Sequence, residues 1–517
     1  MYPTDLQKLD GAILKLAGSR PSHQELRMML EFLDRNDYKN IVSVIQSFTG
    51  NWSLQVYTNK SILLAVDHVS SYPLFYDERS LKVSEYVYAM DSELDINTPQ
   101  YSEFLATGYV LGRNTLQSHL KRVEAGQVLV IDKASKKTLF FDHFVWDPFA
   151  KAKFPVKGDL TTTQSLFENV FDELAWRVSD REILIPLSGG LDSRLILTAL
   201  HERGCKNLRP FTYGPAMNAE SKVARQFCER LNIPWLFVDV PNSFIINFGR
   251  SCIRNEFMHK NWNWSAVPNV QDLHIFAYLK DRNMFSNECV VINGQAGDFI
   301  TGGHVLLPKN EPCLGWFKSA VVDKHFRLIT NEQTRRFEAD YFSNTGYRTY
   351  YERALRSEDP EDWVTLAQIF EWRERQSKYV VAGQRVYDWF GIDWELPLFD
   401  VDLMRYFVSK PPDQLANQAL YRHYISQSYE RKGLVKNQAA ADRWPGALGS
   451  AIKCVARVVG LLGSGRHKKF VYQFCRYFGY YKPYYLAHGY SLYLKTWKYI
   501  RSPVALEVLR LLGYKNG

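Results

Sequence analysis

The chain has 517 residues, of which 46% are hydrophobic and 23% charged, and its formal net charge is +9. This length favours two or three domains, and the composition is that of a soluble globular protein, since no apolar run reaches the roughly 18 residues of a membrane-spanning helix. The 7 cysteines include no Cys-x-x-Cys pair and the 12 histidines no zinc-protease pair, which argues against a disulfide framework and a structural zinc site.

The N-terminal part of the sequence is typical of β-structure. Its first residues contain acidic side chains and no uninterrupted apolar core, unlike a secretory signal, so we expect a cytoplasmic protein. The stretches "WSLQVYT", "SILLAVD" and "QVLVIDKASKKTLFFDHF" alternate or run apolar between turn signals, as strands of a sheet do. We expect a first domain over residues 1–148 and a polar linker with a proline and a glycine over residues 149–162.

Strand-like and helix-like segments then alternate, and they predict an α/β domain over residues 163–445. "EILIPL", "LRPFTYG", "PWLFVDV" and "CVVING" are typical of buried strands, whereas "SRLILTALHERG" and "AESKVARQFCERLN" have helical spacing. This order indicates a doubly wound parallel sheet, whose ligands bind at the carboxyl ends of the strands.

The final segment, residues 446–517, is aromatic and basic. From residue 451 onward it contains 12 Lys and Arg side chains and a single acidic residue, Glu507, so the net positive charge belongs to this segment. Basic side chains interleaved with aromatic ones suit an anionic surface. The alternative is a helical cap on the α/β domain whose charges face solvent, and we favour that interpretation.

The stretch "LSGGLDS" (residues 187–193) lies where a predicted strand turns into a helix. Bare glycines there let backbone N–H groups approach an anion, and the helix N-terminus adds its dipole. Ser188 and Ser193 add hydroxyl donors, and Asp192 is compatible with a phosphate if Mg²⁺ lies between them. Neither a Walker motif nor a Gly-x-Gly-x-x-Gly pattern fits. A tight turn that needs glycine only for its geometry is the alternative.

This stretch resembles the pyrophosphate-binding loop of the N-type ATP pyrophosphatases, which split ATP into AMP and pyrophosphate. Three other segments resemble the asparagine synthetase family in particular, which includes β-lactam synthetase and lasso-peptide cyclases. They are "VVINGQAGDFITGGH" and "LPLFDVDLMRYFVSKPPDQL" in the α/β zone, and "LLAVDHVSSYPLFYDERSLKVSEYVYAM" with "LKRVEAGQVLVID" in the N-terminal zone. The resemblance implies a sandwich-like α+β domain of the Ntn-hydrolase type, followed by a doubly wound ATP pyrophosphatase domain.

The resemblance also implies a reaction and a set of site residues. A carboxylate attacks the α-phosphate of ATP, pyrophosphate leaves, and a nitrogen nucleophile displaces AMP to form an amide. By position, Asp192 and Asp298 would hold Mg²⁺. The nucleotide-binding positions are Leu187, Ser188, Gly189, Gly190, Asp192, Ser193, Tyr213, Asn293 and Gly294. Simpler interpretations remain for three of these stretches: Tyr213 as a core residue, Asn293-Gly294 as a turn and Asp298 as a helix cap.

Two positions depart from the family pattern, and a third matches it only loosely. Gln295 stands where the family has a glutamate that helps to position or deprotonate the amine, and an amide lacks that basicity. Phe299 replaces the acidic residue that follows Asp298. Lys436 stands near the family's catalytic lysine, with Lys432 as the alternate. We therefore take Lys436 and Gln295 as the candidate catalytic positions.

The front of the chain departs most strongly. A working glutaminase domain of this family exposes a cysteine at position 2, but the residue there is Tyr2, and the first cysteine is Cys205. We therefore expect the glutaminase scaffold without its activity. The nitrogen would come from free ammonia, a separate glutaminase or an amine substrate.

Three functions compete at this point. The first is an ATP- and Mg²⁺-dependent, AMP-forming amide ligase acting on a small-molecule carboxylate such as aspartate, or on a uronic acid or a peptide side chain. The second is a catalytically decayed relative that binds or scaffolds. The third, an enzyme acting on tRNA, is suggested only by the basic tail, and the glutaminase-like first domain argues against it. We expect no nucleic-acid partner, and the sequence leaves the oligomeric state open.

Overall fold

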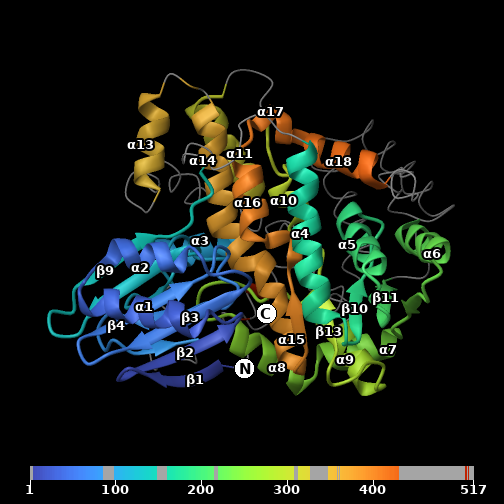
Figure 1. Ribbon diagram of the computed structural model, residues 1–517, viewed down its shortest axis with the longest axis horizontal. Helices are drawn as coiled ribbons and strands as arrows, with labels where there is room; N and C mark the ends of the chain where they lie inside the picture. The colour runs from blue at the N-terminus through green and yellow to red at the C-terminus, as the bar shows by residue number, and fades with distance from the viewer. Residues whose placement is uncertain are drawn as a thin grey trace, which may run out of the picture.

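The computed structural model describes residues 4–85, 98–147, 160–214, 219–307, 312–326, 347–357, 359, 361–429, 507–508 and 511. Two large sheets of different kinds organise these residues (Figure 1). The sheet from the N-terminal part, residues 4–147, is antiparallel, and the later sheet is parallel. This arrangement confirms the predicted fold class. Within the described ranges, no helix combines the length and the apolar character that crossing a membrane requires.

The antiparallel sheet has six strands in the order β1-β2-β3-β4-β8-β9. In that order they span Thr4–Leu9, Ala12–Gly18, Trp52–Tyr57, Ser61–Val66, Gln127–Asp132 and Thr138–Asp142. Alternate residues of the central strands point to opposite faces. Leu63 faces the helices α1 (His23–Asp34) and α2 (Tyr38–Ile45), whereas Leu64 faces a second, three-stranded sheet. That sheet has the order β6-β5-β7 and comprises Val83–Ser84, Phe75–Asp77 and Leu120–Arg122.

The parallel sheet has the order β12-β11-β10-β13-β14. In chain order its strands are β10 (Ile183–Pro186), β11 (Leu208–Tyr213), β12 (Leu236–Val238), β13 (Val290–Ile292) and β14 (Asp393–Glu395). The chain first extends the sheet from β10 to β11 and β12, and later returns to add β13 and β14 on the other side of β10. The strand order therefore reverses between β10 and β13, and ligands of such sheets bind outside the carboxyl ends of the strands at this switch point.

The helices of the later part of the chain pack against one another in connected groups (Figure 1). One group contains α4 (Leu160–Val178), α5 (Leu191–Glu202), α6 (Ala219–Leu231), α16 (Val401–Val408) and α18 (Ala419–Tyr429). A second contains α7 (Asn242–Gly249), α8 (Cys252–Asn261), α9 (Leu273–Asp281) and α15 (Arg385–Phe390). A third contains α11 (Leu314–His325), α13 (Arg348–Arg356) and α14 (Glu361–Phe370). The remaining α-helices of the described residues are α3 (Pro99–Thr107), α10 (Gly297–Ile300) and α17 (Pro412–Leu415).

Helix α14 continues into a π-helical segment, Glu371–Val380, which joins the two halves of the molecule. Lys378 Nζ donates hydrogen bonds of 2.7 Å to the carbonyl oxygens of Val110 and Gly112 in the N-terminal part. The indole N–H of Trp372 donates to the carbonyl of His68 at 2.7 Å. These bonds satisfy backbone groups that the junction buries, and they fix the N-terminal part against the parallel-sheet part.

The predicted limits of the linker and of the C-terminal segment can be compared with the described residues. Helix α4 begins at Leu160, so the last three residues of the predicted linker belong to this helix, while residues 149–159 lie outside the described residues. Of the basic segment, only residues 507, 508 and 511 are described. Glu507 is buried and forms an ion pair with Arg254 of α8. The basic side chains of this segment lie outside the described residues, so the interpretation that they face solvent stays a prediction.

Candidate active site

Residues 187–193 form the connection from β10 to α5, as the sequence predicts. The amide of Ser188 donates to Ser193 Oγ at 3.2 Å, the amide of Gly190 donates to Ser188 Oγ at 3.0 Å, and the two hydroxyl oxygens lie 3.3 Å apart. Gly190 is the N-cap of α5 and makes no side-chain capping bond. The first turn of this 12-residue helix therefore presents N–H groups without a side-chain cap, which favours a bound anion.

The other two predicted residues of this loop have structural constraints. Leu187 is buried, and its N–H donates to the carbonyl of Phe211 at 2.7 Å, so its position is fixed at the end of β10. A Cβ atom at Gly189 would lie 3.3 Å from the backbone of Glu220 in α6. A side chain there would press on Glu220, which would have to shift slightly, whereas glycine fits without a shift.

A second loop, residues 293–297, leads from β13 into α10 and lies against the start of α5. A Cβ atom at Gly294 would come within 2.9 Å of the backbone nitrogen of Ser193. One at Gly297 would lie 2.6 and 2.7 Å from the carboxylate oxygens of Asp192. Both distances are too short for a real contact, so these glycines allow the two loops to touch. The two predicted motifs therefore meet at the switch point of the sheet.

The two predicted metal ligands lie on these touching loops but have opposite electrostatic environments. Burial, followed by the negative charge of Asp298, raises the pKa of Asp192 to about 7, although the hydroxyl of Tyr421 donates to its Oδ1 at 2.9 Å. The Asp298 side chain is 58% exposed. Partial burial opposes its ionisation, but the hydrogen bond from His304 Nε2 at 3.2 Å outweighs it and lowers the pKa of Asp298.

The donor set fits Mg²⁺. Carboxylate oxygens are the hard ligands that this ion prefers, and the effect of Asp298 on the pKa of Asp192 shows that the two carboxylates are close enough to repel each other. A divalent cation between them would relieve that repulsion. Within the described part of the chain, no three or more His, Cys, Asp and Glu side chains cluster as a metal site. Two carboxylates are nonetheless usual for Mg²⁺, which takes its other ligands from water and phosphates.

Tyr213 ends β11 and Asn293 follows β13, the two strands that flank β10. Asp272 connects their side chains through hydrogen bonds. The hydroxyls of Tyr213 and Tyr387 both donate to Asp272, the latter at 2.7 Å, and Asn293 Nδ2 donates to the Tyr387 hydroxyl at 2.9 Å. Burial raises the pKa of Asp272 despite these donors. The side chains of Tyr213 and Asn293 thus shape the rim of the site through a buried network. Sequence analysis missed Asp272 and Tyr387, because nothing local marks them as partners.

The two departures from the family pattern have defined surroundings. Gln295 Oε1 accepts a hydrogen bond from Gln384 Nε2 at 2.7 Å, and its backbone N–H donates to Asn293 Oδ1 at 2.9 Å. Phe299 is buried, and its ring centroid lies 4.7 Å from that of Trp146. Position 299 therefore belongs to the apolar core of this chain, and no metal ligand can come from it.

A cluster around Glu371 adds residues that sequence analysis did not single out. Glu371, buried at the start of the π-helical segment, accepts hydrogen bonds from His304 at 2.8 Å, Arg375 at 3.0 Å and Gln376 at 2.7 Å. Lys324 and His325 lie 3.2 Å from its second oxygen. Burial opposes ionisation of Glu371, but the hydrogen bond from His304 and the neighbouring positive charges outweigh it and lower the pKa of this carboxyl. Of this set, only His304 could have been suspected from the sequence, because it ends the "DFITGGH" stretch.

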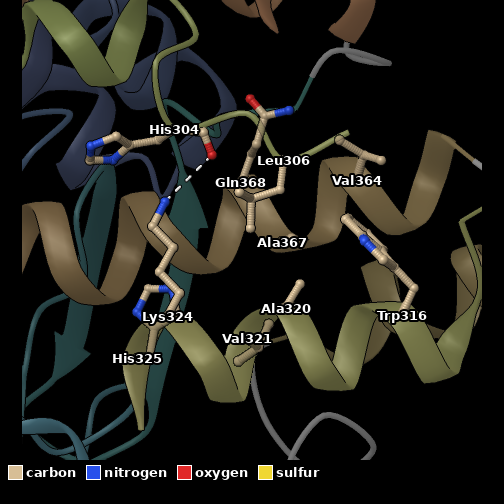
Figure 2. A pocket seen from close by; sticks show the side chains of 10 residues that line it. All are labelled: His304, Leu306, Trp316, Ala320, Val321, Lys324, His325, Val364, Ala367 and Gln368. Carbon is tan, nitrogen blue, oxygen red and sulfur yellow. Dashed lines mark hydrogen bonds between the residues drawn. The ribbon is translucent and has the colours of Figure 1, made fainter. Parts of the chain in front are cut away.

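A small pocket opens beside this cluster. Figure 2 shows Lys324 and His325 next to each other at the end of α11, with His304 facing them and Lys324 Nζ donating to the His304 carbonyl oxygen at 3.4 Å. The remaining wall of the pocket is apolar apart from Gln368. It consists of Leu306, Trp316, Ala320, Val321, Val364, Ala367 and Gln368.

Some of the predicted positions lie outside the described residues. These are the candidate catalytic Lys436, its alternate Lys432, and Tyr2. The structure therefore brings together Ser188, Ser193, Asp192, Gly294 and Asp298 and leaves the lysine without a place. The assignment of Lys436 stays a prediction.

Comparisons with known proteins agree with the geometry of the site. The family model described as asparagine synthase matches residues 169–438. The Microcin J25-processing protein McjC of Escherichia coli is 21% identical over 273 residues, which are 51% of this chain and 48% of that protein. The chain thus matches only about half the length of this curated relative.

Two solved structures of NAD synthetases were also found. The NH3-dependent NAD synthetase of Campylobacter jejuni has a TM-score of 0.24 and 15% identity, with 43% of this chain and 97% of that chain covered. The NAD+ synthetase of Burkholderia pseudomallei has a TM-score of 0.19 and 14% identity, with 55% and 94% covered. These scores are too low to support an argument, and the assignment depends on the family match. Because that match spans just over half of its residues, the chain belongs to the asparagine synthase family of ATP-dependent amide ligases.

Proposed function

We propose that the protein activates a carboxylate as an acyl-adenylate at the expense of ATP, releases pyrophosphate, and then transfers the acyl group to ammonia or an amine. The observation that carries this proposal is the contact between the loop of residues 187–193 and the loop of residues 293–297. This contact places hydroxyl and amide donors beside two carboxylates at the switch point of the sheet.

Each part of this arrangement has a role in the first half of the reaction. The substrate carboxylate attacks the α-phosphorus of ATP, and the bond to the pyrophosphate oxygen breaks. Ser188, Ser193 and the first N–H groups of α5 would bind the pyrophosphate oxygens as negative charge develops there. Asp192 and Asp298 would hold Mg²⁺, which supplies charge neutralisation at the phosphates when bound.

The second half of the reaction forms the C–N bond. The nitrogen attacks the carbonyl carbon of the adenylate, AMP leaves with the electrons of the broken C–O bond, and the nitrogen loses a proton. Gln295 cannot accept that proton, because an amide is not a base at neutral pH. Its bond to Gln384 instead suits a neutral group that orients a reactant. We propose free ammonia, a partner glutaminase or an amine substrate as the source of the nitrogen.

The test is carboxylate-dependent release of pyrophosphate from ATP in the presence of Mg²⁺ and ammonium. Aspartate and a peptide with a side-chain carboxylate are the first substrates to try, the latter because the relative McjC is a microcin-processing protein. Asp192→Ala should abolish the release, whereas Asp180→Ala, at an exposed position just before β10, should retain it. Equal rates for the wild type and Asp192→Ala would refute the ligase. Glutamine in place of ammonium should give no amide.

A binding or scaffolding role is the second candidate, and the changes at positions 295 and 299 are what favour it. A decayed enzyme would bind ATP without releasing pyrophosphate. Nucleotide binding by calorimetry, with no turnover on any carboxylate tested, would support this role over catalysis.

A further inference from the structure

The strongest feature outside the assigned site is a chain of side chains that starts in the N-terminal part and ends on Asp298. The Tyr109 hydroxyl lies 2.7 Å from His325 Nδ1, and His325 Nε2 lies 3.2 Å from Glu371 Oε2. Glu371 Oε1 lies 2.8 Å from His304 Nδ1, and His304 Nε2 lies 3.2 Å from Asp298 Oδ2. We infer that Tyr109, His325, Glu371 and His304 are positioning residues that fix the orientation of Asp298 for the metal. This inference rests on the proposed function.

In this series of side chains, the member nearest the site is His304, and both of its ring nitrogens are hydrogen-bonded. His304 faces a carboxylate with Nδ1 and another with Nε2, so both nitrogens act as donors and the ring cannot rotate without losing a bond. Burial opposes a charged ring, but the bonds to Asp298 and Glu371 outweigh it and raise the pKa of His304. One oxygen of Asp298 is therefore held by the histidine, and the other remains for a cation. Partners of this kind orient metal-binding carboxylates.

The middle of the chain is fixed by the π-helical segment. Gln376, five residues after Glu371, donates from Nε2 to Glu371 Oε1 at 2.7 Å. The wider π turn places these two side chains together, and such segments occur frequently at functional sites. Arg375 adds a bond of 3.0 Å to the same oxygen. Glu371 is therefore a rigid, fully buried acceptor rather than a free carboxylate.

The far end of the chain belongs to the N-terminal part. His325 is buried, and burial is the first cause that lowers its pKa to about 3, so the ring is neutral. The Tyr109 hydroxyl then donates to Nδ1, and Nε2 carries the ring hydrogen, an assignment that follows from the network. Nε2 lies 3.2 Å from Glu371 Oε2 as a polar contact, because that oxygen accepts no hydrogen bond from the described residues. The neighbouring backbone is pinned across the junction, since the Val110 N–H donates to the Ser265 carbonyl oxygen at 2.7 Å.

This arrangement gives the N-terminal part a role at the synthetase site. Tyr109 supplies the last hydroxyl of this series of side chains, so removal of that one oxygen should loosen the orientation of Asp298. The alternative is that the same contacts only fill the junction between the two parts.

The experiment removes single oxygens and measures metal binding directly. Mn²⁺ binding in the presence of α,β-methylene-ATP is followed by electron paramagnetic resonance, alongside the Mg²⁺ dependence of pyrophosphate release. Tyr109→Phe should weaken Mn²⁺ binding and raise the half-saturating Mg²⁺ concentration about 3- to 10-fold, below the 10- to 100-fold typical of direct outer partners. The rate at saturating Mg²⁺ should stay within about twofold of the wild-type rate, since the reacting groups are untouched.

Tyr347→Phe is the matched control. Tyr347 is equally buried in the same layer, and its hydroxyl donates at 2.6 Å to Glu374, another carboxylate of the π-helical segment that lies off the chain to Asp298. It should leave Mn²⁺ binding unchanged. If Tyr109→Phe and Tyr347→Phe behave alike, the inference is overturned.

A double variant gives a second, independent reading. His304, which is partly exposed, can be replaced as His304→Gln with little risk to folding. If Tyr109 acts through His304, adding Tyr109→Phe to His304→Gln should not weaken Mn²⁺ binding further. Additive losses would overturn the inference. Absence of pyrophosphate release from the wild type would instead refute the proposed function, while Mn²⁺ binding would still report on the chain.

Discussion

The two loops at the switch point differ in how they are built. The loop of residues 187–193 combines groups suited to an anion, two hydroxyls 3.3 Å apart and an uncapped helix start, with the buried carboxylate of Asp192. The loop of residues 293–297 and the helix after it carry different groups. They are Gln295, which accepts a hydrogen bond from Gln384, the core residue Phe299, and Asp298, which is bound by a histidine. The difference teaches that the first loop keeps the residues of the family pattern, whereas the second region departs from that pattern at positions 295 and 299.

The largest effect should come from restoring an acid at position 299. Phe299 contacts Trp146 and is buried, so Phe299→Glu would bury a carboxylate without a partner. We expect a loss of about 4 kcal/mol in the free energy of unfolding, measured by urea denaturation. Phe299→Leu should cost about 1 kcal/mol. A stable Phe299→Glu protein would show that this position faces the site rather than the core.

The next largest effect should come from separating the two loops. A Cβ atom at Gly297 would lie 2.6 Å from an Asp192 oxygen, so Gly297→Ala must displace the Asp192 carboxylate. Pyrophosphate release should fall about a hundredfold, as expected when reacting groups shift by about 1 Å.

Gly315→Ala is the control for that substitution. Gly315 lies in α11, and its nearest contact to an added Cβ is Cys313 Sγ at 3.9 Å. This helical substitution should be neutral or slightly stabilising. Equal activity of the Gly297→Ala and Gly315→Ala proteins would break the idea that the loops form one site.

A smaller effect should separate the two halves of the reaction. Gln295→Glu places a carboxylate where Gln384 donates a single hydrogen bond, and that carboxylate can accept the proton that the nitrogen loses. Amide formation should rise about tenfold relative to pyrophosphate release, which corresponds to about 1.4 kcal/mol. Gln427→Glu, exposed on α18, controls for the added charge. Slower amide formation would mean that this position does not work as a base.

The sequence predicts one of these two regions better than the other for a physical reason. The strand–loop–helix pattern around Asp192 and the acid at Asp298 are local, so spacing reveals them. The partners of Asp298 are not local: His325 reaches Tyr109 over 216 positions, and His304 reaches Glu371 over 67. Burial of Phe299 against Trp146 likewise depends on how the N-terminal part seats. No periodicity encodes such contacts, and Lys436 remains a prediction because it lies outside the described residues.

The last effect is one of pH, and it tests whether the junction behaves independently of the loops. Glu103 is buried and accepts a hydrogen bond from the Leu111 N–H at 2.7 Å. Burial raises its pKa from 4.5 to about 8, and the charge of Glu374 adds to this. Between these values the folded protein keeps a proton that the unfolded chain has lost. The free energy of unfolding should therefore fall as pH rises through this window, by at most about 1.4 kcal/mol per pH unit.

Glu103→Gln should flatten that slope, because the amide keeps an acceptor for Leu111 and carries no proton to lose. Urea denaturation of both proteins at pH 5, 6, 7 and 8 measures the difference. Pyrophosphate release at pH 7 should match that of the wild type, since Glu103 is already protonated there and lies off the chain to Asp298. A Glu103→Gln protein with the wild-type slope would place the titrating group elsewhere. A Glu103→Gln protein with a changed Mg²⁺ requirement would show that the whole junction, and not only the contacts from Tyr109 to Asp298, sets the position of the loop of residues 293–297.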